Sequence, residues 1–273
     1  MLRFLPTPIG NLDDISHRVL QALTACEVLI CEDTRVSKSL ISLLNQKLQL
    51  NIAPQHFFTL NSHNQAQFFN AFKPEFFEKN CVYLSDAGMP CVSDPGVELV
   101  KFAQQNGVAY EVFSGSNALL LAVAASGLIE KEFSFLGFLH EKNPARQLDI
   151  SKAINSPFPC VIYESPRRVL TLVEEIFAAL DGERRRIFLI KEATKLHESK
   201  FFGEVGEVLQ TLRNANLSGE WAVVLDKSSS QIETSTLLPQ DILELQIPPK
   251  LKAKLLSKLT GKNAKEIYSA LIC

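Results

Sequence analysis

Short apolar runs alternate along the first part of the chain with stretches in which apolar residues recur at helical spacing. The runs predict strands at residues 2–5, 28–31, 57–60, 81–84 and 110–113, and the stretches between them predict helices at 15–25, 37–44, 65–77 and 96–105. Regular alternation of strands and helices is typical of an α/β domain. We therefore predict a first α/β domain with five strands.

The pattern continues in altered form after residue 114. Strands are predicted at residues 133–138, 161–164, 187–190 and 221–225, with a strongly apolar helix from Ala118 and a second helix at 167–180. This spacing indicates a second α/β domain. The predicted fold class is α/β, with one domain at residues 1–114 and another at 115–227.

The C-terminal residues differ in composition from both domains. Residues 227–236 (KSSSQIETST) are polar, so we predict a linker at 228–239 and a small basic helical domain at 240–273. Residues 248–273 contain six lysines and one glutamate, with leucines at helical spacing and a second short helix after Gly261. Two interpretations stay open: a solvated basic face on a pair of capping helices, or a contact with nucleic acid.

Composition narrows the classes of protein. Hydrophobic residues make up 46% of the chain and charged residues 21%, which excludes wholesale disorder. A net charge of −2 gives no bulk attraction to nucleic acid or to an anionic membrane, so any polyanion site must be local. The apolar run ALLLAVAA at 118–125 is too short to span a bilayer, and prolines and charges interrupt the N-terminal apolar stretch. These features predict a cytoplasmic protein with no membrane partner.

The six cysteines lie far apart and form no C-x-x-C pair, and no histidine lies at zinc-ligand spacing. We interpret them as reduced thiols and predict no metal site.

The candidate functional residues lie in the loops that follow the predicted strands, where ligands bind in open α/β sheets. These loops carry the strings TPIGN, CEDTR, SDAGMP, SDPG and SGSNA in the first domain, and YESPRR and KEATKLHE in the second. None matches a dinucleotide-binding or Walker-type glycine pattern, which argues against nucleotide triphosphates. Taken singly, Asp86 and Asp94 suit helix caps or turns, and Gly88 and Gly96 suit turns. Their joint occurrence favours a binding site.

These residues resemble a known family. The strings TPIGNLDDIS, CEDTR, TLNSHNQ, YLSDAGMPCVSDPG, ASGL, FLGF, YESPRRV and EATKLHE, in this order, are similar to the bacterial small-subunit (16S) ribosomal RNA cytidine 2'-O-methyltransferases of the tetrapyrrole methylase superfamily. The resemblance covers about residues 2–225 and implies two α/β domains with S-adenosylmethionine in the cleft between them. It also implies a homodimer that acts on ribosomal RNA or the small ribosomal subunit.

Carried over residue by residue, the resemblance assigns contacts to the methyl donor. The implied cofactor-binding residues are Pro8, Ile9, Asp86, Ala87, Gly88, Met89, Asn117, Ala118, Tyr163, Trp221 and Ala222. The chain departs from the family pattern at SGSNA, where the family usually has PGPSA, and at Met89, where it usually has threonine.

The reaction implied is transfer of a methyl group to a ribose 2'-hydroxyl, for which alignment and a proton acceptor are needed. The candidate bases are Asp33, Glu192 and His197, which we do not rank, and Arg35, Arg168 and Lys195 are candidate phosphate or orienting contacts. Two alternatives stay open. One is a relative that methylates a tetrapyrrole or a protein residue, and the other is a non-catalytic RNA-binding assembly factor.

Overall fold

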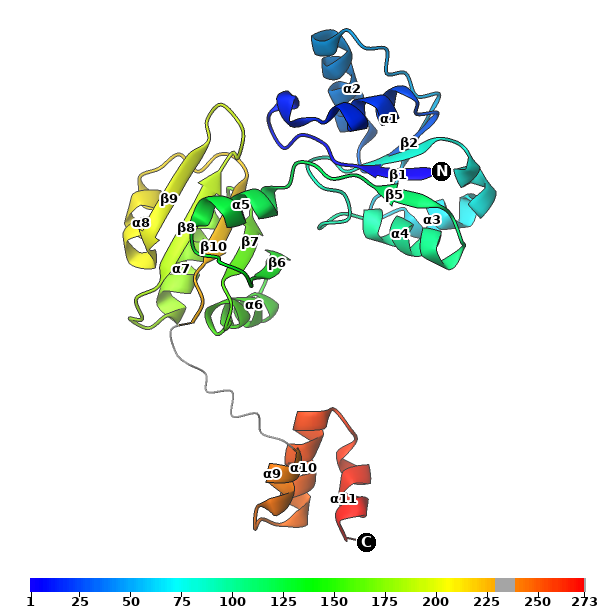
Figure 1. The fold of residues 1–273 in the computed structure, drawn as a ribbon. Helices are drawn as coiled ribbons and strands as arrows, with labels where there is room; N and C mark the ends of the chain where they lie inside the picture. The colour runs from blue at the N-terminus through cyan, green and yellow to red at the C-terminus, as the bar shows by residue number, and fades with distance from the viewer. Residues whose placement is uncertain (229–238, 273) are drawn as a thin grey trace. The chain divides into compact units, whose positions relative to one another are not determined.

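The computed structural model describes residues 1–228 and 239–272 (Figure 1). The chain divides into two compact units, the first of which is Met1–Ser228. We call it the N-terminal unit and the remainder the C-terminal unit. The N-terminal unit holds two five-stranded sheets with helices packed on them, which confirms the predicted α/β class.

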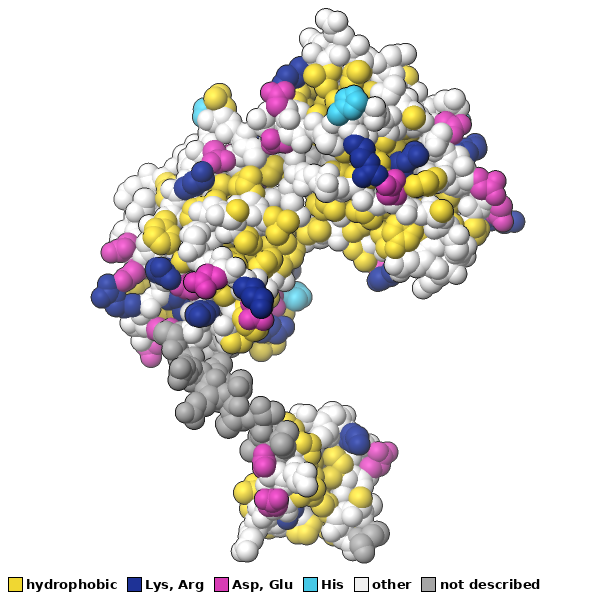
Figure 2. Space-filling model, viewed as in Figure 1, with side chains coloured by type: hydrophobic (Ala, Val, Ile, Leu, Met, Phe, Trp, Pro, Cys, Tyr) yellow, Lys and Arg dark blue, Asp and Glu magenta, His cyan; other side chains and the backbone are white. Residues whose placement is uncertain are grey.

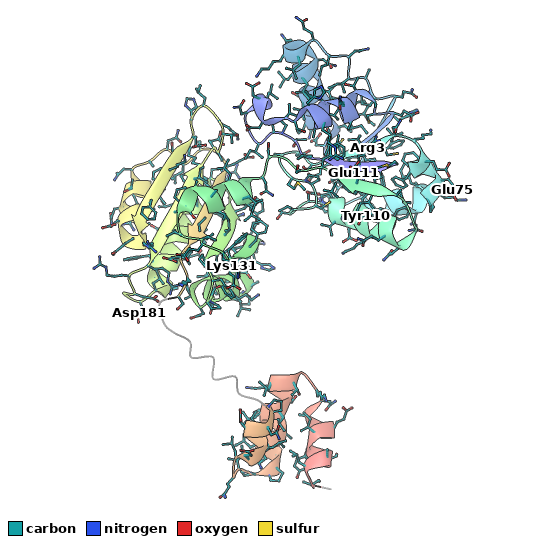
Figure 3. All side chains as sticks on the ribbon, viewed as in Figure 1. Arg3, Glu75, Tyr110, Glu111, Lys131 and Asp181 are labelled. Atoms are coloured by element: carbon teal, nitrogen blue, oxygen red, sulfur yellow. The ribbon has the colours of Figure 1, made fainter. Side chains whose placement is uncertain are left out.

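The first sheet is entirely parallel. Its strands run in the order β3-β2-β4-β1-β5, and they are β1 (Leu2–Leu5), β2 (Val28–Cys31), β3 (His56–Thr59), β4 (Cys81–Leu84) and β5 (Tyr110–Val112). Every residue of β2 and β4 is buried because helices cover both faces of the sheet, which explains their unbroken apolar sequences. Arg3 of β1 is in register with Glu111 of β5, and Figure 3 labels both on this sheet.

Helices pack on both faces of the first sheet. One core includes α1 (His17–Thr24) and α2 (Thr34–Leu48), and the other includes α3 (Gln65–Ala71), the 3-10 helix η2 (Pro74–Glu78) and α4 (Gly96–Gln105). A further 3-10 helix, η1 (Leu12–Asp14), precedes α1.

Two helix predictions differ from the structure by three or more residues at one or both ends. The predicted helix 65–77 ends at Ala71 and resumes as a 3-10 turn, because Pro74 lacks an N–H and disfavours helical geometry at the preceding residue. The predicted helix 37–44 is longer in the structure and begins at Thr34, where the Asp33 side chain caps it by accepting a hydrogen bond from the Arg35 N–H.

The second sheet is mixed. Its order is β6-β7-β10-β8-β9, with β6 and β7 parallel and the other pairs antiparallel. The strands are β6 (Ser134–Phe138), β7 (Cys160–Glu164), β8 (Arg186–Lys191), β9 (Ser199–Glu204) and β10 (Trp221–Leu225). The sequence did not predict β9, an edge strand whose half-exposed residues lack a buried apolar run.

The two faces of the second sheet have different covers. On one face the core includes α6 (Ala145–Ile154), α7 (Val169–Ala179) and α8 (Val205–Arg213), whereas α5 (Ala118–Ser126) packs on the other. Of these helices, α6 and α8 were not predicted from the sequence. The face beneath α5 is the one that leads to the cavity described below.

The C-terminal unit consists of α9 (Pro239–Glu244), α10 (Pro249–Thr260) and α11 (Ala264–Ile272), and α10 packs against both others. Its buried residues are Ile242, Ala253 and Leu256, whereas Leu251 and Leu259 are exposed. The helices at 249–260 and 264–272 match the predicted basic pair, and α9 was not predicted. Most of the predicted linker 228–239 lies outside the described residues. In the part of the chain that the structure describes, we find no helix long and apolar enough to cross a membrane.

Candidate active site

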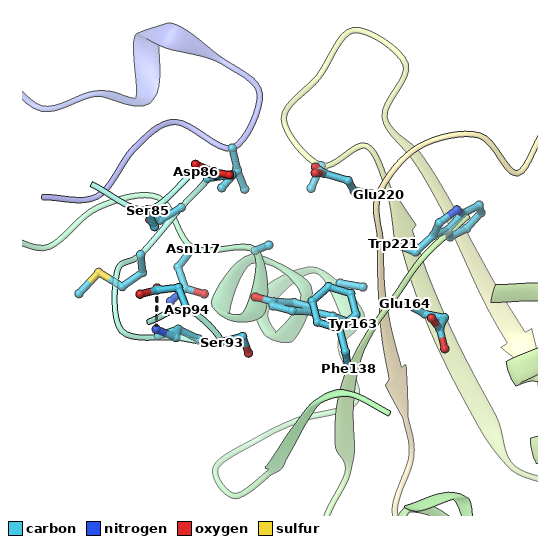
Figure 4. Close-up of a pocket in the computed structure, with 18 of the residues that line it drawn as sticks. Ser85, Asp86, Ser93, Asp94, Asn117, Phe138, Tyr163, Glu164, Glu220 and Trp221 are labelled. Atoms are coloured by element: carbon cyan, nitrogen blue, oxygen red, sulfur yellow. Dashed lines mark hydrogen bonds between the residues drawn. The ribbon is translucent and has the colours of Figure 1, made fainter. Parts of the chain in front are cut away.

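A cavity of about 420 Å³ lies in the N-terminal unit, within the size range of small-molecule sites. It is bounded by the loops that follow β1, β2 and β4, by the start of α5, and by β7 and β10 of the second sheet (Figure 4). The lining residues are Ile9, Glu32, Ser85, Asp86, Ala87, Gly88, Met89, Val92, Ser93, Asp94, Asn117, Ala118, Phe138, Tyr163, Glu164, Ser165, Pro166, Ile190, Ala193, Glu220, Trp221 and Ala222.

Backbone hydrogen bonds join the loops after β1 and β4. The Thr7 N–H donates to the Gly88 carbonyl at 2.9 Å, and the Gly88 N–H donates to the Thr7 carbonyl at 3.1 Å. Gly88 has a φ of 82°, and a Cβ there would lie 3.0 Å from Ile9 Cγ2. A side chain at this position would therefore meet both backbone strain and a lining residue.

A second pair of hydrogen bonds joins the loops after β2 and β4. The Asp86 N–H donates to Glu32 Oε1 at 2.9 Å, and the Asp33 N–H donates to Asp86 Oδ1 at 3.2 Å. This reciprocal contact fixes Glu32 and Asp86 beside each other at the wall of the cavity. Burial raises the pKa of the Glu32 carboxyl to about 7, and burial also raises the pKa of Asp86.

Asp94 organises the turn before α4. Its carboxylate accepts hydrogen bonds from the Gly96 N–H at 2.7 Å, the Val92 N–H at 3.2 Å and the buried Tyr83 hydroxyl at 3.0 Å. The intervening Ser93 has a φ of 67°, so the turn holds a non-glycine residue in the left-handed region. These hydrogen bonds bear out the structural interpretation of Asp94 as a turn former.

The opposite wall includes two aromatic side chains, Tyr163 and Phe138. Figure 4 shows the Tyr163 ring reaching into the cavity towards Asn117, with Phe138 beside it. Burial raises the pKa of Tyr163 to about 12, so its phenol is neutral near pH 7. The Trp221 side chain points away from the cavity, where its Nε1–H donates to the Leu217 carbonyl at 2.9 Å. Trp221 therefore offers backbone to the cavity, and its ring belongs to the core of the second sheet.

Beneath this wall lies a buried ionic network. Glu164 is 1% exposed and accepts hydrogen bonds from Arg146 Nη1 at 3.3 Å and Arg168 Nε at 2.8 Å. Arg146 also donates to Glu175 at 2.7 Å, and Arg168 pairs with Glu141. The network connects α6, β7 and α7, and it leaves Arg168 engaged by two carboxylates.

The rim carries a separate charged cluster. The Lys195 ammonium lies 2.9 Å from Glu192 Oε1 and 2.9 Å from Glu220 Oε2. Burial alone would lower the pKa of Lys195, but the hydrogen bonds to the two carboxylates outweigh it and raise the pKa. A Cβ at Gly10 would lie 2.2 Å from Lys195 Cγ, so the absence of a side chain at Gly10 lets the loop after β1 approach this cluster.

The structure brings ten of the eleven predicted cofactor-binding residues to the cavity. Pro8 does not line it and directly precedes Ile9, which does. The ten are Ile9, Asp86, Ala87, Gly88, Met89, Asn117, Ala118, Tyr163, Trp221 and Ala222. Their contacts with the methyl donor stay predictions.

The three candidate bases and the three candidate phosphate or orienting contacts, Arg168 among them, lie outside the cavity lining. Asp33 and Arg35 pair with each other at 2.6 Å at the start of α2, and the Arg35 side chain is 90% exposed. A hydrogen bond from Arg35 lowers the pKa of Asp33 to about 2. Glu192 and Lys195 belong to the rim cluster, and His197 is exposed on the same loop.

The predicted catalytic and cofactor-binding residues do not include Glu32, Ser93, Asp94, Phe138, Glu164 or Glu220, all of which line the cavity. Most lie within the highlighted strings CEDTR, SDPG and YESPRR. The strings therefore located the site, but the choice of residues within each string required the direction of each side chain.

The lining suits S-adenosylmethionine. Its charged side chains are Glu32, Asp86, Asp94, Glu164 and Glu220, and it includes no lysine, arginine or histidine. Carboxylates suit a ligand that carries a sulfonium and an ammonium group. Apolar residues such as Ile9, Val92 and Ile190 suit an adenine ring. Among the described residues, no group of three or more histidine, cysteine or acidic side chains is placed to hold a metal.

Comparison with known proteins places the chain in a family. The family model described as Tetrapyrrole (Corrin/Porphyrin) Methylases matches residues 1–209. The chain is 56% identical over 275 residues to a ribosomal RNA small subunit methyltransferase I from Campylobacter fetus subsp. fetus, covering 100% of both chains. It is 43% identical over 281 residues to one from Helicobacter pylori, covering 98% of this chain and 96% of the relative.

Solved structures share the fold at low sequence identity. A cobalt precorrin-4 methyltransferase superposes with a TM-score of 0.59 and 16% identity, over 82% of this chain and 94% of that chain. A uroporphyrin-III C-methyltransferase from Thermus thermophilus, complexed with S-adenosylhomocysteine, superposes with a TM-score of 0.56 and 16% identity, over 82% and 96%. The chain therefore belongs to the tetrapyrrole methylase family and, within it, to the ribosomal RNA small subunit methyltransferase I group, whose members are S-adenosylmethionine-dependent methyltransferases.

Proposed function

We propose that this methyltransferase transfers a methyl group from S-adenosylmethionine to the 2'-hydroxyl of a cytidine in 16S ribosomal RNA. The observation that carries the proposal is 56% identity, over the whole length of both chains, to a relative named as a ribosomal RNA small subunit methyltransferase. The acidic cavity without cationic residues supports the methyl donor. The choice of cytidine and of the 2'-hydroxyl rests on the sequence motifs.

In this proposal, residues that line the cavity bind and orient the methyl donor for attack by the hydroxyl. When bound, S-adenosylmethionine supplies an electrophilic methyl group. The loop 86–89 and the N-terminus of α5 at Asn117 position the donor, while Tyr163 and Phe138 exclude water from its apolar wall. Alignment is the main contribution to in-line transfer, with the attacking oxygen held about 3–3.5 Å from the methyl carbon.

We propose that charged residues at the edge of the cavity contact the RNA substrate. Arg35 is exposed and Lys195 is partly exposed, and each is paired with carboxylates. We assign them to RNA phosphates, which would exchange with those carboxylates on binding. Asp33, Glu192 and His197 remain candidate bases from the sequence, although Asp33 and Glu192 are held in ion pairs.

The C-terminal unit gives a second RNA contact in this proposal. Its six lysines are concentrated in residues 248–273 of a chain that is acidic overall. Cations of this kind bind phosphates without reading sequence. We place the reaction in the cytoplasm, where the small ribosomal subunit is assembled.

We further propose a homodimer. The helix α5 is apolar on every side apart from Ser126, and Leu120 on it is 55% exposed. Figure 2 shows hydrophobic side chains gathered on the face of the N-terminal unit over α5, with few charges among them. Contiguous exposed apolar surface is typical of interaction sites. Sedimentation equilibrium of the parental protein and of Leu120→Lys tests it, since a monomeric parental protein would refute the dimer.

One experiment tests the reaction. The protein is incubated with methyl-labelled S-adenosylmethionine and small ribosomal subunits that lack the modification, and the RNA is digested to locate the label. We expect one labelled cytidine whose 2'-oxygen carries the methyl group. Label on a base or on a protein refutes the 2'-O assignment. Binding of the donor without any transfer favours a non-catalytic assembly factor, and transfer to uroporphyrin III instead of RNA favours a tetrapyrrole methylase.

A further inference from the structure

The carboxyl groups that line the cavity differ in how fully they are engaged. Asp94 accepts three hydrogen bonds within its turn, and Glu164 is held by two arginines and the Ser165 N–H. Glu220 pairs with Lys195 at the rim, and its side chain is 72% exposed. To accept a proton from the substrate, each of these three carboxyl groups would first have to give up its existing hydrogen bonds or ion pair.

The other two lining carboxyls, Glu32 and Asp86, each receive one hydrogen bond from the facing loop. Arg35 lies close enough to Asp86 to oppose the rise in its pKa, whereas among the described residues none of the interactions that shift the pKa of Glu32 comes from a cation. Glu32 Oε1 is fixed at 2.9 Å from the Asp86 N–H, which orients the carboxyl. A carboxyl that is oriented through one oxygen and free of a counter-ion is suited to exchange a proton at the other.

We infer that Glu32 is the general base of the methyl transfer, accepting the proton of the RNA hydroxyl through Oε2 while the Asp86 N–H holds Oε1. This inference rests on the proposed function. It takes the place of the candidate bases Asp33, Glu192 and His197, none of which lines the cavity, and it leaves the residues assigned to the methyl donor unchanged.

The step balances without any further reactant. The O–H bond of the ribose breaks and its proton passes to the Glu32 carboxylate. The oxygen lone pair forms the new O–C bond to the methyl group, and the electrons of the C–S bond stay with sulfur. The products are the methylated ribose, neutral S-adenosylhomocysteine thioether and protonated Glu32, which returns its proton to water after release.

The surroundings of Glu32 set the pH at which it works. The titratable groups that face it are Asp86 and Asp94 from the loop after β4, Tyr83 from β4, and its neighbour Cys31. Burial and the negative charges of Asp86 and Asp94 raise its pKa to about 7, against the lowering effect of the Asp86 N–H. A base whose pKa lies near the working pH is well matched to general catalysis.

The test compares Glu32→Gln with the parental protein and two controls. Methylation is followed in single turnovers on small subunits lacking the modification, and donor affinity is measured by calorimetry. We expect Glu32→Gln to bind S-adenosylmethionine within about threefold of parental affinity and to methylate about 100-fold more slowly or worse. Glu98→Gln, which removes an exposed carboxylate on α4, should match the parental protein in both. Asp86→Asn should lose donor affinity, because Asp86 is assigned to the donor.

The dependence of kcat/KM on pH provides a second test. Parental kcat/KM should fall about tenfold per pH unit below pH 7, and Glu32→Gln should lose this dependence. A parental rate in Glu32→Gln, or an equal loss of donor affinity and rate, overturns the inference. If the variant does not fold, a parental profile that is flat between about pH 6 and 8 overturns it. A parental protein that methylates no RNA refutes the proposed function instead.

Discussion

At the scale of single residues, the site depends on backbone conformations that few side chains can adopt. Gly88 holds a positive φ where the loops after β1 and β4 meet, and Ser93 and Glu192 hold positive φ values without being glycine. Such residues persist where the surrounding hydrogen bonds fix them, and they concentrate at functional sites. Here the two non-glycine residues lie at the wall and the rim of the cavity.

Gly88→Ala should weaken the binding of S-adenosylmethionine about tenfold or more, because the new Cβ would press on Ile9 and the backbone would lose its preferred φ. Gly107→Ala is the matched control, since Gly107 has a φ of 66° with nothing within 4 Å of a Cβ. Calorimetry on both variants measures the effect. Equal donor affinities in the two variants would show that the loop does not contact the donor.

Glu32→Gln should also change stability in a pH-dependent way. The folded protein raises the pKa of Glu32 from 4.5 to about 7, so the ionised form destabilises the fold. The stability contributed by the protonated form is complete below about pH 4.5 and is lost as the pH rises through 7. The variant should therefore melt above the parental protein at pH 8, with the difference disappearing at pH 4. A difference that stays constant with pH would contradict the raised pKa.

At the scale of secondary-structure elements, the second sheet is braced by the buried network of Arg146 and Glu164. The two side chains are 6% and 0% exposed, and they tie α6 to β7 below the aromatic wall. Removing one partner of a buried pair leaves an uncompensated charge, which costs far more than losing an exposed pair.

Arg146→Ala should lower the free energy of unfolding by about 3 kcal/mol, the low end for a buried pair because Arg168 still faces Glu164. Arg213→Ala removes an exposed pair with Glu174 and should cost about 1 kcal/mol or less. Urea denaturation of both variants provides the comparison. If the two variants lose equal stability, the network does not brace the second sheet.

At the scale of the whole molecule, charge is distributed unevenly. Residues 248–273 carry a net charge of +5 in a chain of net charge −2, so the remaining residues carry −7. The acidic remainder suits a cationic methyl donor, whereas the basic residues suit RNA phosphate.

Truncation after Lys227 should leave donor affinity near parental and weaken RNA binding, because the cavity proposed for the donor is lined only by residues of the N-terminal unit. The slope of log affinity against log salt should flatten by roughly 0.7–0.9 for each lysine that neutralises a phosphate. Melting temperature, donor affinity and salt slope are measured together on the truncated chain. An unchanged slope in a folded truncation would exclude the C-terminal unit from RNA binding.

The sequence alone determined the α/β class, four of the central strands to the residue, and most of the loops that line the cavity. Buried parallel strands such as Cys81–Leu84 are easily predicted from the sequence, because both of their faces are apolar. The edge strand Ser199–Glu204 and the helix Ala145–Ile154 were missed, because partly exposed elements carry a weaker pattern.

Tertiary structure decided which side chains of each loop face the cavity. Glu32 and Asp33 are adjacent in the sequence, yet Glu32 lines the cavity while Asp33 caps α2 and pairs with Arg35. Likewise, Glu220 lines the cavity while Lys195, its partner in the ion pair, stays at the rim. Composition and spacing identify a loop that carries candidate functional residues. Burial, side-chain direction and long-range hydrogen bonds arise only when distant segments pack, and these three features set the pKa of each titratable group.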